Sequence, residues 1–255
     1  MTRPVAAAIL SFTEIDVGEH RAFNEWHRFD HMPEQFVLDG VVAAERLVAT
    51  PDLAARRDAV DGSLAATQYF GFYLIAQPIH KTFRELGELA IAVQGDDRWF
   101  ERRGPSGRYR LLQMYSAPNV VSDPAVMPFR PHQGVFVTVD DPKPGARQSD
   151  LATDHARHEE TRVRAVLDLP GAAGCWSFEA SGSLATRPQP GIIATPIRRA
   201  IRVYWLDADP GAFVDAFAAL APDERPDGQH CYSTVFSGGY RFIRPDSEFD
   251  WFDGA

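Results

Sequence analysis

The chain contains an internal repeat, and this feature restricts its fold more than any other. Residues 36–47, FVLDGVVAAERL, align with residues 166–178, VLDLPGAAGCWSF, when Leu38 is matched to Leu169. The same offset of 131 residues makes three further pairs: Gly40 with Gly171, His27 with His158, and Tyr73 with Tyr204. Matches that keep one order and one offset indicate two structurally equivalent halves.

Each half shows the pattern of a β-α-β-β-α-β unit. Alternating β-branched and aromatic residues predict the strands, and longer periodic segments that follow Asp, Ser or Pro predict the helices. In the first half, the expected strands are 4–15, 41–50, 67–78 and 107–117, with helices over 16–37 and 79–94. In the second half, they are 134–141, 172–180, 199–208 and 230–243, with helices over 149–169 and 211–221.

Two units of this pattern match the ferredoxin-like motif, whose sheet has an apolar face that must be covered. We therefore predict an α+β fold of two fused ferredoxin-like repeats. Their antiparallel sheets would pack face to face as an intramolecular α+β barrel that encloses a cavity. The expected boundaries are 1–117 for the first repeat, 118–132 for a proline-rich linker, 133–245 for the second repeat, and 246–255 for an acidic aromatic tail.

The charge of the chain excludes two classes of partner. The 255 residues carry a formal net charge of −9 and no stripe rich in Lys or Arg, which argues against nucleic acid and against anionic membranes. No apolar segment approaches the roughly 18–20 residues of a membrane-spanning helix. The N-terminal segment resembles a strand more than an export signal, so we expect a cytoplasmic protein. Two distant cysteines do not predict a disulfide in that compartment.

The first predicted helix carries a stripe of polar residues. His20, Asn24, His27 and His31 fall on one side of it, whereas Phe29, Met32 and Phe36 fall on a different, apolar side that could pack on the sheet. A solvated helix surface and an acid/base site both fit this pattern. An imidazole suits proton transfer near neutral pH because its unperturbed pKa is about 6.5.

This region resembles the dimeric α+β barrel superfamily, and within it the EthD-like proteins. The matching residues are Phe23, Trp26, His31, Pro33 and the following LDGVVAAERL (residues 38–47), which form an aromatic helix, a His-x-Pro motif and a glycine turn into a strand with an arginine. The resemblance implies that His31 lies near a ligand cavity. Members of the superfamily include cofactor-free monooxygenases, lactone isomerases, polyketide cyclases, sugar mutarotases and haem enzymes, so the resemblance does not define one reaction.

The second half departs from this motif. Arg162 stands where the first half has His31, which suggests one working half, and leaves His27 with a counterpart in His158. Arg162 could hold a carboxylate or enolate as a fixed cation, although the charged residues around it also fit a solvated helix. Tyr73 and Tyr204 occupy matched strand positions. Together with Tyr69, they fit either a ligand cavity or ordinary core packing.

Metal binding is a rival interpretation of His27 and His31, because histidines four residues apart on a helix can share one ion. The spacing alone is a weak signal, and we expect no metal. No GxGxxG, P-loop, GxSxG or CxxC motif occurs, so nucleotide, serine-hydrolase and dithiol chemistry are not indicated. We expect no cofactor.

The resulting hypothesis is a cofactor-independent enzyme that acts on a small aromatic or polyketide-like substrate by isomerisation, cyclisation or lyase chemistry. His31, or His27, would be the general acid/base, and the substrate would be bound by Asn24, Trp26, Tyr69, Tyr73, His158, Arg162 and Tyr204. A cofactor-free monooxygenase and a non-catalytic metabolite-binding protein are the alternatives. Whether the chain also forms a homodimer is left open.

Overall fold

Both halves contain the predicted strands and helices in the predicted order. The computed structural model describes residues 4–95, 100–180, 192–194, 196, 198–220, 231–244, 246–247 and 249–252. Half one consists of β1 (Val5–Thr13), α1 (His20–Trp26), a π-helical segment η1 (His27–His31), α2 (Met32–Gln35), β2 (Val41–Val48), β4 (Tyr69–Ala76), α5 (Ile79–Gly95) and β5 (Gly104–Ser116). Half two consists of β6 (Gly134–Pro142), α6 (Gln148–Leu167), β7 (Ala172–Ala180), β9 (Ala200–Leu206), α7 (Pro210–Ala218) and β10 (Tyr232–Phe242).

The remaining elements are short. The segment between β2 and β4 holds α3 (Pro51–Ala54), β3 (Asp58–Ala59) and α4 (Gly62–Ala65), and β8 (Ile192–Ala194) pairs with β5. The predicted linker contains the 3₁₀-helix η2 (Pro124–Phe129), whose Met127 is completely buried in the core between the sheets. No helix among the described residues is long and apolar enough to cross a membrane.

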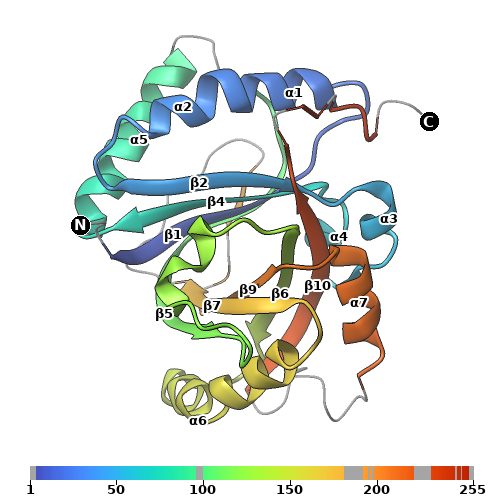
Figure 1. The fold of residues 1–255 in the computed structure, drawn as a ribbon. Helices are drawn as coiled ribbons and strands as arrows, with labels where there is room; N and C mark the ends of the chain where they lie inside the picture. Colours follow the sequence, from blue (N-terminus) through green and yellow to red (C-terminus); the bar gives the residue numbers. More distant parts are fainter. Residues whose placement is uncertain are drawn as a thin grey trace.

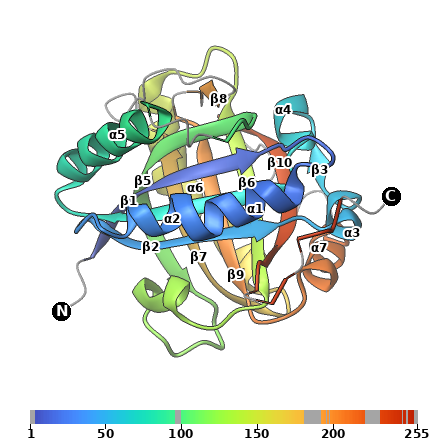
Figure 2. The same cartoon turned by 90° about the horizontal axis from the view of Figure 1, so that it is seen from above.

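The two halves have the same strand order, and together they close a barrel (Figures 1 and 2). Half one follows the order β5-β1-β4-β2, and half two follows the order β10-β6-β9-β7. β2 pairs with β10 and β7 pairs with β5, so each half joins the other at both edges. The predicted α+β barrel fold is therefore confirmed, with the two sheets continuous at their edges as well as facing each other.

Alternation along the strands separates the barrel interior from the surface under the helices. Phe70 and Phe72 point into the interior, where they pack with Trp176, Trp205 and other apolar side chains. The interior is therefore a packed core, and the expectation of an enclosed cavity there was wrong. The alternate residues face outward beneath α1, η1 and α5 in half one, and beneath α6 and α7 in half two.

The orientation of the first helical segment, which comprises α1, η1 and α2, is opposite to one of our expectations. Phe29 is 70% exposed and Phe36 is 47% exposed, whereas the polar stripe faces the sheet and is buried. The predicted helix start was also wrong, because Asp16 forms an ion pair with Arg103 and the helix begins without a side-chain cap. Asp209 caps the N-terminus of α7, since its carboxylate accepts from the backbone N–H groups of Gly211 and Ala212.

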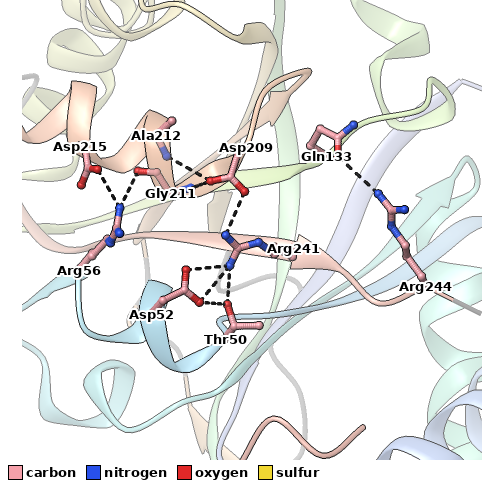
Figure 3. Close-up of polar contacts among 10 residues, drawn as sticks. All are labelled: Thr50, Asp52, Arg56, Gln133, Asp209, Gly211, Ala212, Asp215, Arg241 and Arg244. Carbon is pink, nitrogen blue, oxygen red and sulfur yellow. Dashed lines mark hydrogen bonds and ion pairs between the residues drawn. The ribbon is translucent and has the colours of Figure 1, made fainter. Parts of the chain in front are cut away.

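A cluster of ion pairs spans the seam between β2 and β10 (Figure 3). Only two residue pairs join these strands. The guanidinium of Arg241 donates to Asp52 of α3 and to Asp209 at the start of α7, and Arg56 donates to Asp215 at 2.8 Å. The cluster thus ties the short helices of half one to α7 of half two. Each exposed ion pair contributes little to the free energy of unfolding on its own. We therefore infer that the main role of the cluster is to keep β2 and β10 aligned at the seam.

Gly134, at the start of β6, is a sharp test of this packing. A Cβ atom there would lie 2.1 Å from the carbonyl oxygen of Tyr240 and 2.4 Å from Cγ of Pro210. Neither neighbour can move freely, because one is paired backbone and the other a rigid ring. We expect Gly134→Ala to lower the free energy of unfolding by about 1–3 kcal/mol in urea titrations. Gly62→Ala is the control, since a Cβ atom there meets no neighbour within 4 Å; equal stability of both variants would contradict this account.

Candidate active site

A cavity of about 130 Å³ lies between the outward surface of the half-one sheet and the helices that cover it. The polar groups of its lining come from η1, α2, four strands and the segment before β5, which supplies Arg102. The lining consists of Ile9, Ser11, Thr13, Phe23, His27, His31, Gln35, Arg46, Gly71, Tyr73, Leu86, Gly87, Ala90, Arg102, Ser106 and Arg108. His27, His31 and Tyr73, predicted from the sequence as site residues, therefore come together at one cavity.

His27 and Tyr73 are in direct contact in this cavity. Nε2 of His27 and the hydroxyl of Tyr73 lie 3.2 Å apart and share a hydrogen bond. Burial lowers the pKa of His27 well below its ordinary value of 6.5, and the nearby charges of Arg46, His31 and Arg102 lower it further. Burial raises the pKa of Tyr73 to about 12. At neutral pH the pair is thus an uncharged imidazole beside a protonated phenol.

His31 is held by an aromatic stack. Its ring lies on that of Trp26, with centroids 4.5 Å apart and planes 18° apart, and its centroid is 5.5 Å from that of His27. Both histidines belong to the π-helical segment, in which the N–H of Met32 donates to the carbonyl of His27. Pro33 follows at once. Because proline has no N–H and its ring crowds the preceding turn, a widened turn accommodates it better than a regular α-helical one.

Asn24 and Tyr69 do not line the cavity; they form a buried hydrogen-bond network behind it. The amide nitrogen of Asn24 donates to the hydroxyl of Tyr69 at 2.9 Å and to the carbonyl of His20 at 2.6 Å. Its amide oxygen accepts from Nη2 of Arg46 at 2.5 Å. Trp26 is also absent from the lining. The structure therefore places these three predicted substrate contacts around the cavity residues, supporting them from behind.

Arg46 is the main site residue that the sequence hypothesis did not include. It lies on β2, is 7% exposed, and stacks over the ring of Phe23 at 4.4 Å. Burial lowers the pKa of its guanidinium to about 9. Its Nε and Nη1 atoms have no hydrogen-bond partner among the described residues, and no described carboxylate pairs with it. A charged residue on the outward, helix-covered side of a strand was the signal that could have identified it.

The cavity is cationic although the chain is acidic. Arg102 and Arg108 line it together with Arg46, and no Asp or Glu is among its lining residues. Burial lowers the pKa of Arg102 to about 10, and it also lowers that of Arg108. The pKa of Arg102 remains well above neutral pH, so its guanidinium keeps its charge. A ligand or intermediate with negative charge would therefore be favoured here.

A second cavity, of about 280 Å³, lies on the other side of His27 and Arg46. The C-terminal segment forms part of its wall through Ile243 and the buried Phe249. Figure 1 shows this segment running from β10 toward α1. The ring of Phe252 packs on that of His20 with centroids 4.7 Å apart. The predicted aromatic tail of half two is thus part of the wall around the half-one site.

The predicted residues of half two lie elsewhere. Arg162 is buried in α6 and donates to Asp154 at 2.7 Å, and Tyr204 packs in the apolar cluster beneath α6 and α7. His158 lies in α6, but its side chain is outside the described residues. Neither Arg162 nor Tyr204 lines the half-one cavity. Their role in substrate binding therefore stays a prediction.

The described side chains contain no group of three or more His, Cys, Asp or Glu residues arranged to hold a metal ion. His27 and His31 are therefore not joined there by a third ligand of these types. Arg46 and Arg102 instead place positive charge next to His27, which disfavours a cation at that point. The expectation of a site without metal or cofactor stays a prediction.

Comparison with known proteins supports the fold. No family model matches the sequence, and no curated protein matches it. An anthrone oxidase-like protein of known structure superposes with a TM-score of 0.51 at 11% identity, over 94% of this chain and 92% of that one. A chlorite dismutase variant from Candidatus Nitrospira defluvii gives 0.47 at 12% identity, over 99% of this chain and 97% of that one. The first similarity shows a shared fold alone: the chain is an α+β barrel of two ferredoxin-like halves.

Proposed function

We propose that this protein is an enzyme of small-molecule metabolism that moves protons in the half-one cavity, with His27 and His31 as its acid/base pair. The observation that carries the proposal is the buried, uncharged imidazole of His27 at the cavity wall. It is bonded to Tyr73 on one side and flanked by the cationic Arg46. A base that stays neutral at pH 7 beside fixed positive charge suits abstraction of a proton next to a carbonyl or phenol.

The chemistry follows from the geometry. An imidazole nitrogen of His27 accepts a proton from the substrate, and the electron pair left behind moves onto a substrate oxygen. The guanidinium groups of the cavity stabilise that oxyanion. Return of the proton to a different atom, from His27 or His31, gives isomerisation. Attack of the carbanion on a carbonyl carbon of the same substrate, followed by return of the proton to the alkoxide oxygen that forms, gives cyclisation. Loss of a leaving group from the same anion gives a lyase reaction.

Three further points belong to this proposal. Half one alone would carry the activity, because half two has no counterpart of His31. Membership of the EthD-like group is supported by the His-x-Pro motif. A tandem duplication is supported by the 131-residue register shared by the paired strands, as in Ala44–Tyr73 and Cys175–Tyr204.

A cofactor-free monooxygenase is the second candidate. The anthrone oxidase-like protein that shares the fold is named for an oxidation, and the same proton abstraction would give a carbanion that can transfer electrons to O₂. A protein that only binds a metabolite is the third. The three candidates predict different outcomes when a compound enters the cavity: a rearranged product, an oxidised product, or binding without turnover.

One experiment separates them. The protein is incubated in D₂O with a panel of small aromatic and phenolic compounds that have an acidic C–H or O–H group, and mass spectrometry and an oxygen electrode follow the reaction. Enzyme-dependent incorporation of deuterium at a carbon atom, or a new isomer, without oxygen uptake supports the leading proposal. Oxygen uptake supports the monooxygenase, and binding without turnover supports the third candidate. His80→Gln is the matched control for replacing His27 or His31 by glutamine, since His80 is exposed at the start of α5.

A further inference from the structure

The two halves bury one arginine each at matching positions of the sheet, but on opposite strands of the pair. In half one, Arg46 of β2 lies opposite Gly71 of β4; in half two, Arg202 of β9 lies opposite Ser177 of β7. Residues 177 and 202 are each 131 positions beyond 46 and 71. The arginine and the small residue have therefore exchanged strands. Each half thus presents a guanidinium to the space beneath its helices.

Half two neutralises its arginine with its own carboxylates. Nε and Nη2 of Arg202 donate to the two oxygens of Glu159 at 2.9 and 2.5 Å, and Nη1 donates to Asp140 at 2.5 Å. Ser177 also donates to Glu159, at 2.5 Å. Arg202 and Glu159 are each only 1% exposed. A guanidinium buried this deeply is normally compensated by a well-placed anion, and half two contains that anion.

Half one has neither carboxylate. With the same offset, Arg28 takes the place of Glu159. Thr13 takes the place of Asp140 in the strand pairing, because Thr13 lies opposite Tyr69 and Asp140 lies opposite Ala200, which is 131 positions beyond Tyr69. Arg46 donates only to Asn24, through Nη2, at 2.5 Å to the side-chain oxygen and at 3.4 Å to the backbone carbonyl. Its Nε and Nη1 atoms have no partner among the described residues, and the side chain lines the cavity. Half two thus supplies its own carboxylates to Arg202. Half one has no carboxylate at the equivalent positions beside Arg46, and this is where its cavity lies.

We infer that the half-one cavity binds a small organic carboxylate, and that Arg46 is its principal partner. The inference rests on the proposed function, because it names the substrate class of the same site. Arg102 and Arg108 add positive charge to the lining. The cavity volume of about 130 Å³ is close to that of an engineered cavity that accepts benzene, about 150 Å³. A carboxylate on a single ring or a short chain therefore fits.

The first test is ligand binding to the full chain, measured by calorimetry and by thermal unfolding. Benzoate is the probe, benzamide is its neutral counterpart, and inorganic phosphate is a second anion. We expect benzoate to bind and to raise the midpoint of unfolding, with benzamide and phosphate each binding at least tenfold more weakly. Arg46→Met should weaken benzoate binding roughly 10- to 100-fold. Arg84→Met is the control, since Arg84 is exposed on α5. Benzamide or phosphate binding as tightly as benzoate would overturn the inference, and so would Arg46→Met leaving benzoate affinity unchanged.

A second pair of variants tests the inference without removing Arg46. Gly71 lies opposite Arg46 and lines the cavity, and a Cβ atom there meets only the Ser11 hydroxyl at 3.1 Å and the Glu45 carbonyl at 3.7 Å. Gly71→Asp would give half one an internal carboxylate, whereas Gly71→Asn has the same size without the charge. We expect the Asp variant to bind benzoate at least tenfold more weakly than the Asn variant. Equal binding by the two would overturn the inference.

The two proposals fail in different ways. His27→Gln removes the proposed base but leaves Arg46 in place, so benzoate affinity should change less than threefold. If that variant retains full turnover while Arg46→Met loses benzoate, the acid/base proposal fails and the carboxylate site stands. If His27→Gln loses turnover but Arg46→Met binds benzoate normally, the carboxylate inference fails alone.

Discussion

Replacement of His27 by glutamine is expected to lower kcat about 10²–10⁴-fold on the substrate that the panel identifies. Glutamine keeps a polar group near Tyr73 but cannot accept a proton at neutral pH. Tyr73→Phe should have a smaller effect, because it removes only the group that orients the imidazole. His31→Gln distinguishes the two histidines: a comparable loss would assign His31 a proton of its own. Full activity of the His27, His31 double variant would rule out acid/base catalysis by this pair.

The pH profile provides an independent readout of the same residue. The base works only when it is deprotonated, so kcat/KM should fall as the pH falls through the pKa of His27. Burial and the charges of Arg46, His31 and Arg102 place that pKa well below 6.5. Activity should therefore stay level from pH 7 down past 6.5 and decline only in more acidic buffer. A decline centred at or above 6.5 would show that another group is the base.

The largest effect on stability is expected from breaking the buried cluster of half two. Arg202→Met would leave the carboxylates of Glu159 and Asp140 buried without their common partner. Removal of one member of such a pair typically costs about 3–5 kcal/mol, and urea titration would measure it. Arg56→Ala breaks an exposed pair with Asp215 and should cost less than about 1 kcal/mol. Similar losses in both variants would mean that burial does not strengthen the Arg202 cluster.

Acid should act through the same cluster. The charge of Arg202, together with its hydrogen bonds, lowers the pKa of Glu159 from an ordinary 4.5 to about 2, against an opposing effect of burial. The folded state thus favours the ionised form, and this contribution is complete above about pH 4.5 and is lost as the pH falls toward 2. A shift of this size corresponds to about 3 kcal/mol. Glu159→Gln should show a weaker dependence of unfolding free energy on pH between 4.5 and 2.

The repeat was sufficient to predict the strands and their equivalence, because register depends on local alternation that both halves share. It did not predict which side of the first helical segment (α1, η1 and α2) is buried. When this segment is treated as one isolated helix, Phe29 and Phe36 are better candidates for the core than the polar stripe, yet both are exposed. The polar stripe is buried because its groups bond to Tyr69 and Tyr73, which are more than forty residues away in the sequence.

The different surroundings of Arg46 and Arg202 were also hard to predict, because they too depend on residues that are distant in the sequence. Nothing local distinguishes Arg46, which faces a cavity, from Arg202, which is closed by carboxylates from two other elements. The difference appears only when the paired strands are compared across the halves. The sequence did identify His27, His31 and Tyr73 as candidate site residues. The repeat aligned His27 and Tyr73 with residues of half two, and the His-x-Pro motif contains His31.

The π-helical turn at residues 27–31 amounts to one extra residue in an otherwise α-helical path. Removal of a single residue from it would let the helix close as a regular α-helix, and would rotate everything before it by about 100° relative to α2. The Arg46 contact of Asn24 and the Tyr69 contact of His20 would both be lost from the sheet side. The length of this segment, as well as its composition, is therefore part of the site. A protein of this fold that has both histidines but lacks the extra residue should not be expected to share the chemistry.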